Sequence, residues 1–267
     1  YYLVRAQDST GNLSDSSAAD SAVIGGNAIG IDGNASEWTG ALPDTELNSV
    51  ISGAEWIWRD PAGDQRSDAA DPDSNYALKE ARFTGDVRGM SILLRFDNIT
   101  DVTFPYVTLA VDKDPAAGGG EQWFGQFLEA TLNSVAWRDY EIIINNTKTG
   151  HLGIGAGGWT WKDTGVSFIS SSNDVIEANF PWYSLGISLP KKVRLTLATA
   201  RNNAGNPEEI FGADIVDAVT TAAGNTWTDI GDGQLDYYFD IGFNADGRPN
   251  TAPAAPLSKA LRPPSDI

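Results

Sequence analysis

The chain has 267 residues, 41% of them hydrophobic and nine of them tryptophan, so it can bury a sizeable core in one large domain or two small ones. A formal net charge of −18 argues against nucleic acid and anionic membrane surfaces as partners, because phosphate binding needs clustered lysine and arginine. The absence of cysteine excludes disulfides and thiolate ligands, and the single histidine, His151, leaves little room for triad or multi-histidine chemistry. Because His151 lies between Gly150 and Leu152, we expect it at a turn on the surface.

Residues 1–24 open the chain with strand-like alternation. Tyr2, Val4 and Ala6 share one face, and a turn follows at 9–12. This stretch closely resembles the last hairpin of a fibronectin type III domain. We expect it to be either the end of a neighbouring domain or a strand that pairs with a sheet edge of this chain or of another copy.

Residues 25–248 are expected to form one domain. Short alternating runs separated by Gly, Asp and Asn turns predict strands, and two short stretches, 181–185 and 215–219, are interpreted as single helical turns. About ten strands of this kind predict an all-β fold, an antiparallel β-sandwich of the jelly-roll type. The predicted strands cover 55–59, 77–84, 89–97, 106–111, 125–130, 136–145, 165–170, 175–180, 192–199 and 236–242.

The closing stretch, residues 249–267, is rich in proline and alanine and is interpreted as an extended linker or tail. No run of about 18 apolar residues occurs anywhere in the chain, so we expect no membrane insertion. We expect an extracellular or cell-surface protein, and a secreted protein without disulfides fits a bacterial or archaeal exterior better than a eukaryotic one.

An acidic loop follows the aromatic run Trp56-Ile-Trp58. Pro61, Gly63 and Pro72 rule out a helix through it. Several carboxylates on one loop repel one another unless a hard cation such as Ca²⁺ neutralises them, and the alternative is a merely solvated acidic loop. The candidate Ca²⁺ ligands in this loop are Asp60, Asp64, Asp68, Asp71 and Asp73.

Three motifs in order along the chain resemble one family. Ile31-Asp-Gly-Asn-Ala-Ser-Glu-Trp38 is similar to the entry strand of DOMON-like and family-nine carbohydrate-binding-module sandwiches. Asp60-Pro-Ala-Gly-Asp64 resembles a segment of the C-terminal domains of glucodextranases and pullulanases. The late strands around 140–144, 175–186 and 194–199 match the same superfamily.

The resemblance covers most of residues 28–243 and implies a β-sandwich, often with structural Ca²⁺. In the enzymes of that superfamily such a domain is an accessory or adhesion module and not the catalytic one. Sugar binding in family-nine modules uses stacked tryptophans, but no particular pair of tryptophans in this chain aligns with them.

Exposed aromatic residues are the candidates for glycan binding. Trp159 and Trp161 lie in a Gly-rich stretch and share one face if it forms a strand, and Asp163 or Lys162 could bond sugar hydroxyls. Trp123 follows a Gly-rich loop and offers a second platform. The alternative for all three rings is packing on the sandwich, which is the expectation for the other tryptophans of the strands.

Two further aspartate groups suit Ca²⁺ or ordinary turn capping. Asp112 and Asp114 follow a strand and precede a Gly-rich loop, and Asp232 lies in a Gly-Asp-Gly turn. Both groups are added to the candidate metal ligands, with turn chemistry as the alternative.

Catalysis is not expected. A glycosidase needs two carboxylates facing a sugar, and only Glu141 and Glu177 fall within strong strand patterns, where Glu177 belongs to a turn motif with a structural role. We therefore expect a non-catalytic, glycan-binding accessory module of a secreted polysaccharide-active protein. The alternative is a structural surface protein, such as an S-layer, stalk or filament subunit, that assembles through residues 1–24.

Overall fold

The structure is a computed structural model that describes residues 29–61, 63–65, 74–124, 130–155, 158–201, 215–220 and 233–250, without the side chains of residues 154, 155, 158, 159 and 201. The expected hairpin at 1–24, most of the tail at 249–267, nearly all of the predicted strand at 125–130 and the candidate ligands Asp68, Asp71, Asp73 and Asp232 lie outside the described residues.

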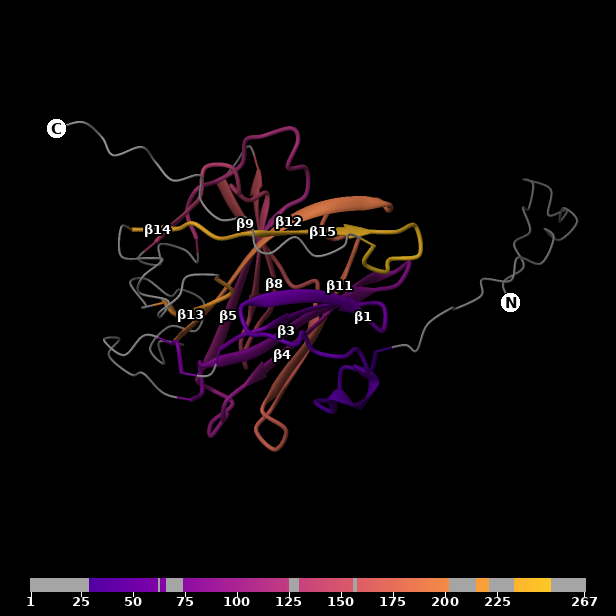
Figure 1. Cartoon of the computed structure of the whole chain (residues 1–267). Helices are drawn as coiled ribbons and strands as arrows, with labels where there is room; N and C mark the ends of the chain where they lie inside the picture. Colours follow the sequence, from indigo (N-terminus) through magenta and orange to yellow (C-terminus); the bar gives the residue numbers. More distant parts are fainter. Residues whose placement is uncertain are drawn as a thin grey trace, which may run out of the picture.

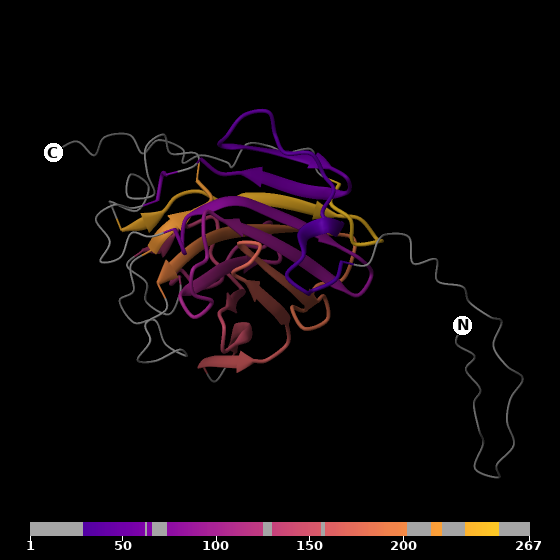
Figure 2. The same cartoon turned by 90° about the horizontal axis from the view of Figure 1, so that it is seen from below.

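Two antiparallel sheets form the sandwich, which confirms the predicted all-β fold. Sheet 1 has the strand order β1-β2-β3-β4-β11-β10. Figures 1 and 2 show its indigo, purple and orange-brown strands in two views. Its strands are β1 (Asn48–Ser52), β2 (Glu55–Arg59), β3 (Leu78–Gly85), β4 (Gly89–Phe96), β10 (Val166–Ser170) and β11 (Val175–Pro181).

Sheet 2 has the order β13-β12-β5-β7-β8-β9, and β15 pairs with the first half of β12. A small parallel pair, β14 (Gln234–Leu235) with β6 (Thr131–Leu132), is separate from both sheets. The strands of sheet 2 are β5 (Pro105–Asp112), β7 (Tyr140–Ile144), β8 (Thr149–Gly155), β9 (Gly158–Lys162), β12 (Lys191–Arg201), β13 (Ile215–Ala218) and β15 (Phe239–Phe243).

The main core fills the space between the sheets. The Trp56 ring of β2 stacks on the Phe239 ring of β15 with 4.4 Å between centroids, so an aromatic contact joins sheet 1 to sheet 2. Trp58 and Trp182 are also buried there, as expected for the strand tryptophans. Fully burying one such side chain stabilises the fold by about 1.5–3 kcal/mol, so these contacts hold the two layers together.

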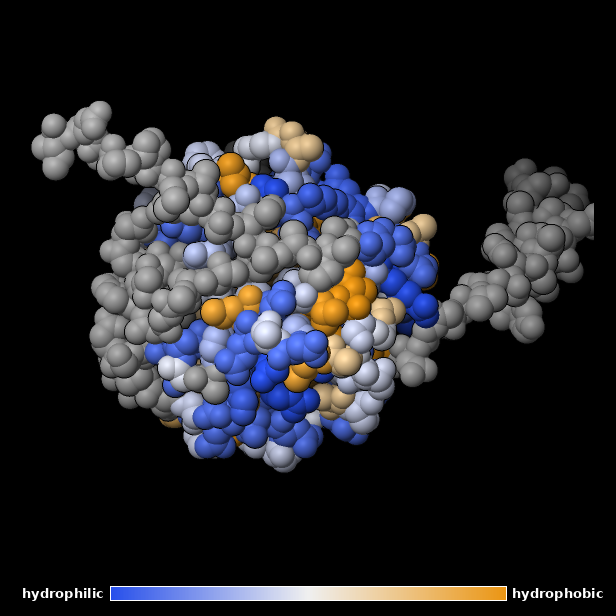
Figure 3. All heavy atoms as spheres, viewed as in Figure 1, coloured by the Kyte–Doolittle hydropathy of each residue, from blue (hydrophilic) through white to orange (hydrophobic). Residues whose placement is uncertain are grey.

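Both outer faces of the sandwich are also partly covered. Residues 29–40 cross the outside of sheet 1, where Trp38 packs on Leu93 and Val175, and the 3₁₀ turn η1 (Ala35–Glu37) lies over this face (Figure 2). A second apolar cluster covers the outside of sheet 2. Both faces of β5 are covered, which explains why all eight of its residues are buried. A strand buried on both faces has a nearly continuous apolar sequence. The visible surface is mainly hydrophilic, with smaller apolar patches (Figure 3).

The segment 29–40 is anchored by buried carboxylates of sheet 1. Glu177 accepts hydrogen bonds from the backbone N–H groups of Asp32 and Gly33 and from Trp38 Nε1, at 3.1, 2.7 and 2.8 Å. A side chain at Gly33 would collide with Phe168, which is why this close approach needs glycine. Glu177 thus has a structural role, as predicted: it fixes the motif at residues 31–38 on sheet 1.

Most predicted strands match observed ones, with three kinds of correction. The stretch 215–219 was expected to be a helical turn, but residues 215–218 form β13, because pairing with β12 supplies the backbone partners that a lone turn lacks. β1, β8 and β9 were not predicted, since Gly and polar residues break their alternation. The strand predicted at 136–145 begins only at Tyr140, after a turn.

Candidate metal centre

Asp60 lies directly after β2, at one end of the sandwich. Its backbone N–H donates to the Lys79 carbonyl at 3.0 Å, and its carboxylate Oδ1 accepts from Trp58 Nε1 at 2.6 Å. Because the Trp58 ring is fixed in the core, this hydrogen bond fixes the Asp60 carboxylate as well. Asp60 is itself buried, and its second oxygen, Oδ2, has no hydrogen-bond partner among the described residues.

Asp64 and Gln65 follow in the turn after Pro61. Gly63 adopts a φ of +86°, a left-handed conformation that favours glycine and reverses the chain here. Asp64 is buried, and within the described part of the chain neither of its carboxylate oxygens has a hydrogen-bond partner. The Gln65 side-chain oxygen is likewise buried without one. Four acceptor oxygens, one of Asp60, two of Asp64 and one of Gln65, are therefore buried without a hydrogen-bond donor among the described residues.

A third carboxylate comes from the other sheet. Asp217 lies in β13 of sheet 2, and its Oδ2 accepts a 2.7 Å hydrogen bond from the backbone N–H of Leu78 at the start of β3. Its Oδ1 accepts from the Ala218 N–H at 2.8 Å. Asp217 thus already links the two sheets through the backbone of β3. The sequence analysis missed this residue because it lay in the stretch interpreted as a helical turn.

Asp60, Asp64 and Asp217 form a triad in which one oxygen from each carboxylate lies within 4.8 Å of the others. Burial raises the pKa of Asp60 well above its usual value, and the charges of Asp217 and Asp64 add to the effect. Burial also raises the pKa of Asp64 to about 6, with a contribution from Glu46. Without a cation, it is therefore energetically unfavourable for all three carboxylates to be ionised at once.

The donor set of this triad is made of oxygen only. Carboxylates with an amide oxygen nearby suit a hard cation, and Ca²⁺ takes six to eight such oxygens in an adaptable geometry. The residues present fit the predicted Ca²⁺, since the triad joins two of the predicted ligands, Asp60 and Asp64, with Asp217. Within the described ranges, this triad is the one place where three or more acidic or histidine groups meet closely enough to bind a metal.

The metal-free protein is expected to lose stability as the pH rises from about 4 to about 7. The pKa of Asp64 is raised to about 6 in the folded state, from 3.8 for the free side chain, so the folded state keeps a proton that the unfolded chain has lost. That contribution, about 3 kcal/mol at most, is present at low pH and disappears as the pH rises through 6. Urea unfolding in chelator at several pH values measures it.

Asp64→Asn is the matched variant for this pH dependence, since it keeps the side-chain shape and removes the titration. Its unfolding free energy should change less between about pH 4 and about pH 7 than that of the wild-type protein. If the two proteins show the same pH profile in chelator, Asp64 does not titrate in the folded state as described.

The other described metal candidates are engaged in turn chemistry. Asp112 Oδ1 accepts from the Asp114 N–H at 2.9 Å, which caps the end of β5. Burial raises the pKa of Asp112. Asp114 forms a 3.4 Å ion pair with Lys191. Among the described residues no third acidic group lies close enough to both aspartates to share a metal ion with them, so they do not form a second triad.

One of the aromatic candidates, Trp161, packs against the apolar cluster on the outside of sheet 2. The Trp161 ring is partly buried on this cluster, its Nε1 donates to Asp163 Oδ1 at 2.5 Å, and Lys148 Nζ lies 5.4 Å from the ring centroid. Trp159 belongs to β9, but its side chain lies outside the described residues. Trp123 leaves 39% of its surface exposed.

The backbone beneath Trp123 is held firmly although the ring is exposed. Trp123 pairs with Thr131 in an isolated bridge, and its carbonyl accepts a 2.6 Å hydrogen bond from Arg138 Nε. Arg138 is fully buried and forms a 2.9 Å ion pair with Glu141, which is fully buried too. Trp123 is therefore presented to solvent from a fixed position.

His151 was expected at the surface, but it is buried in β8 and faces the space between the sheets. Its Nδ1 lies 2.7 Å from Thr164 Oγ1, and the Tyr140 ring meets it edge-on at 5.2 Å. Burial lowers the pKa of His151, and Lys162 adds to this effect. The turn expected at 150–152 is instead continuous strand, because β7 and β9 pair with β8 on either side.

No helix in the described part of the chain combines the length and apolar character needed to cross a membrane. Comparison of the sequence with protein-family models and with curated proteins gives no match. The functional argument therefore depends on the geometry of the buried aspartate triad and on the positions of Trp123 and Trp161.

Proposed function

We propose that this protein is a non-catalytic β-sandwich module that binds Ca²⁺ structurally at Asp60, Asp64 and Asp217 and binds a glycan on the outer face of sheet 2. One observation carries the proposal. Two loop carboxylates of sheet 1 and one strand carboxylate of sheet 2 converge within 4.8 Å, and Asp60 Oδ2 and both Asp64 oxygens are buried with no donor in the described part of the chain. A Ca²⁺ ion at this position stabilises the end of the sandwich by joining its two layers.

The burial of the triad favours a structural role over catalysis. A glycosidase needs two carboxylates on either side of a bound sugar, and these three side chains are enclosed where no sugar can enter. The two strand glutamates are also engaged, since Glu177 holds the segment 31–38 and Glu141 pairs with Arg138. These contacts support a module that binds without reacting.

The glycan part of the proposal rests on Trp123 and Trp161 with Asp163. An indole ring on a fixed backbone can stack on the apolar face of a sugar ring, and a nearby carboxylate can accept from sugar hydroxyls. Asp163 already orients the Trp161 ring through its hydrogen bond. This arrangement fits an accessory module of a secreted bacterial or archaeal polysaccharide-active protein, as the family resemblance implies.

Trp123→Ala is expected to weaken the binding of a soluble α-glucan about tenfold, because it removes the exposed stacking surface. The measurement is a titration followed by intrinsic tryptophan fluorescence and repeated by calorimetry. Val87→Ala removes an exposed apolar side chain from the distant β3–β4 turn and should leave the affinity unchanged. Wild-type protein that binds none of a panel of neutral and acidic glycans would refute the glycan-binding function.

A further inference from the structure

A small layer of three paired segments carries Trp123. On one side of β6, Thr131 pairs with Trp123 in an antiparallel bridge. On the other side of β6, Thr131 pairs with Gln234 of β14, and the Thr131 N–H donates to the Gly233 carbonyl at 2.9 Å. Residues directly opposite each other in paired strands share one face, so Trp123, Thr131 and Gln234 form a row across this layer.

The burial of the neighbouring residues shows which way the row faces. Phe124, Leu132 and Leu235 each follow a member of the row in sequence, and all three are buried in the apolar cluster on the outside of sheet 2. The members of the row alternate with them, so they point away from the cluster, and Trp123 is exposed while the other two are partly exposed. The layer therefore presents an indole ring, a hydroxyl and a carboxamide to solvent.

The polar members of the row are held in place and offer hydrogen-bonding groups of both kinds. Thr131 Oγ1 donates to the Gly233 carbonyl at 3.3 Å, and Gln234 Nε2 donates to the Leu132 carbonyl at 3.2 Å. A hydroxyl also has acceptor lone pairs, and a carboxamide has two N–H donors and an acceptor oxygen. Because paired strands lie about 4.8 Å apart, the row extends roughly 10 Å, which is longer than one sugar ring.

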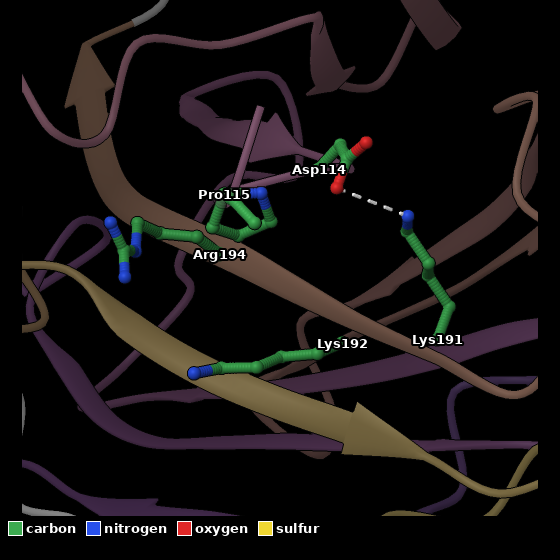
Figure 4. A pocket seen from close by; sticks show the side chains of 6 residues that line it. Asp114, Pro115, Lys191, Lys192 and Arg194 are labelled. Atoms are coloured by element: carbon green, nitrogen blue, oxygen red, sulfur yellow. Dashed lines mark ion pairs between the residues drawn. The ribbon is translucent and has the colours of Figure 1, made fainter. Parts of the chain in front are cut away.

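The charges of the chain favour a neutral ligand for this row. The formal net charge of −18 repels an acidic polysaccharide, and the row itself is uncharged. The basic side chains of the hollow where β12 begins are paired with carboxylates, Lys191 with Asp114 and both Lys192 and Arg194 with Asp240. Figure 4 shows the Lys191 and Lys192 side chains pointing in opposite directions, so this hollow does not bring their ammonium groups together on one anion.

We propose that Trp123, Thr131 and Gln234 form an extended subsite that binds more than one consecutive sugar unit of a neutral glycan. Trp123 stacks on one sugar ring, and Thr131 Oγ1 and the Gln234 carboxamide exchange hydrogen bonds with hydroxyl groups of the next. The inference rests on the proposed glycan-binding function and adds the class of glycan and the residues that recognise its length.

The test titrates the Ca²⁺-loaded full chain with methyl α-glucoside and with methyl α-maltotrioside, followed by intrinsic tryptophan fluorescence. We expect the trisaccharide to bind about tenfold more tightly, because only the longer ligand reaches from Trp123 to Gln234. Thr131→Val keeps the β-branched shape and removes the hydroxyl, so it should weaken trisaccharide binding about three- to tenfold. Gln234→Met should act in the same direction, and both variants should bind the monosaccharide as the wild-type protein does.

Thr45→Val is the matched control, because it removes an exposed hydroxyl near β1 of sheet 1 that accepts a similarly long hydrogen bond from Asn48 Nδ2, at 3.4 Å. Its affinity for the trisaccharide should be unchanged. A maltotrioside with its primary hydroxyls oxidised to carboxylates should bind more weakly than the neutral form.

Equal affinities of the wild-type protein for the two neutral ligands would overturn the inference. So would unchanged trisaccharide binding in Thr131→Val, an equal loss for both ligands in that variant, or a carboxylated form that binds as tightly as the neutral one. If Trp123→Ala still weakens the binding of soluble α-glucan in those cases, the proposed function stands. Wild-type protein that binds no glycan refutes both.

Discussion

Removal of Ca²⁺ with a chelator is expected to lower the melting temperature of the protein by roughly 5–10 °C. A ligand present at about one hundred times its Kd stabilises the folded state by about 2.7 kcal/mol. In a chain of this size each kcal/mol shifts the melting temperature by roughly 2–4 °C. The physical reason is that Asp60, Asp64 and Asp217 are brought together in the folded state and remain mutually repulsive without a cation.

Variants of the triad separate a bound ion from a general effect of chelator. Asp217→Asn should abolish the response to Ca²⁺, and so should the double variant Asp60→Ala/Asp64→Ala, since each removes ligand charge from the triad. Asp97→Asn changes an exposed carboxylate that pairs with Lys79 and should respond like the wild-type protein. A wild-type melting curve that does not move with chelator contradicts the account of a metal centre.

Arg138→Met is expected to destabilise the protein by about 3–5 kcal/mol, because it leaves Glu141 charged and buried without its cation. Both side chains are fully buried on the outside of sheet 2, and Thr108 Oγ1 donates to the second Glu141 oxygen at 2.5 Å. Arg138 Nε also supports the Trp123 carbonyl, so glycan binding should weaken together with stability. Denaturant unfolding gives the free energy.

The double variant Arg138→Met/Glu141→Leu should recover a large part of that loss, because it replaces the whole pair with apolar side chains of similar size. The exposed pair of Arg88 and Asp86 is the surface control, and Arg88→Met should cost at most about 1 kcal/mol. If Arg138→Met destabilises no more than Arg88→Met, the buried pair contributes little to the fold.

The all-β class could be predicted because the strands of sheet 1 other than β1 show regular alternation or short apolar runs between turns. β2, predicted as 55–59, matches the structure, and β4 and β11 differ by one residue at an end. β8 and β9 could not be predicted in the same way, since their glycines and polar residues hide the alternation. Their pairing with β7 comes from tertiary contacts, which a local pattern does not contain.

The aspartate triad was predictable only in the part that is local in sequence. Asp60 and Asp64 are close along the chain, and Pro61 with Gly63 marks the turn that presents both of them. Asp217 reaches the same point through the pairing of β13 with β12 and its hydrogen bond to Leu78. The single clue in the sequence is an aspartate inside the apolar run Ile215–Ala218, where a buried charge needs a partner.

The exposure of aromatic rings depends on tertiary packing and could be predicted only in part. Trp161 is partly buried, because Gly150 on the neighbouring strand leaves space beneath its ring. Tyr183 was not predicted at all, yet it is 82% exposed on a turn closed by hydrogen bonds such as Gly186 N–H to the Tyr183 carbonyl. Sequence periodicity assigns a face to a strand residue but does not show what covers that face.

Terbium luminescence is the measurement that tests the metal centre most directly. Tb³⁺ takes oxygen ligands as Ca²⁺ does, and Trp58, whose Nε1 bonds Asp60, is placed to sensitise its emission. We predict sensitised emission from the wild-type protein, its displacement by Ca²⁺, and its loss in Asp217→Asn. Emission that is absent from the folded wild-type protein, or that persists unchanged in Asp217→Asn, would contradict a Ca²⁺ site shared by the two sheets.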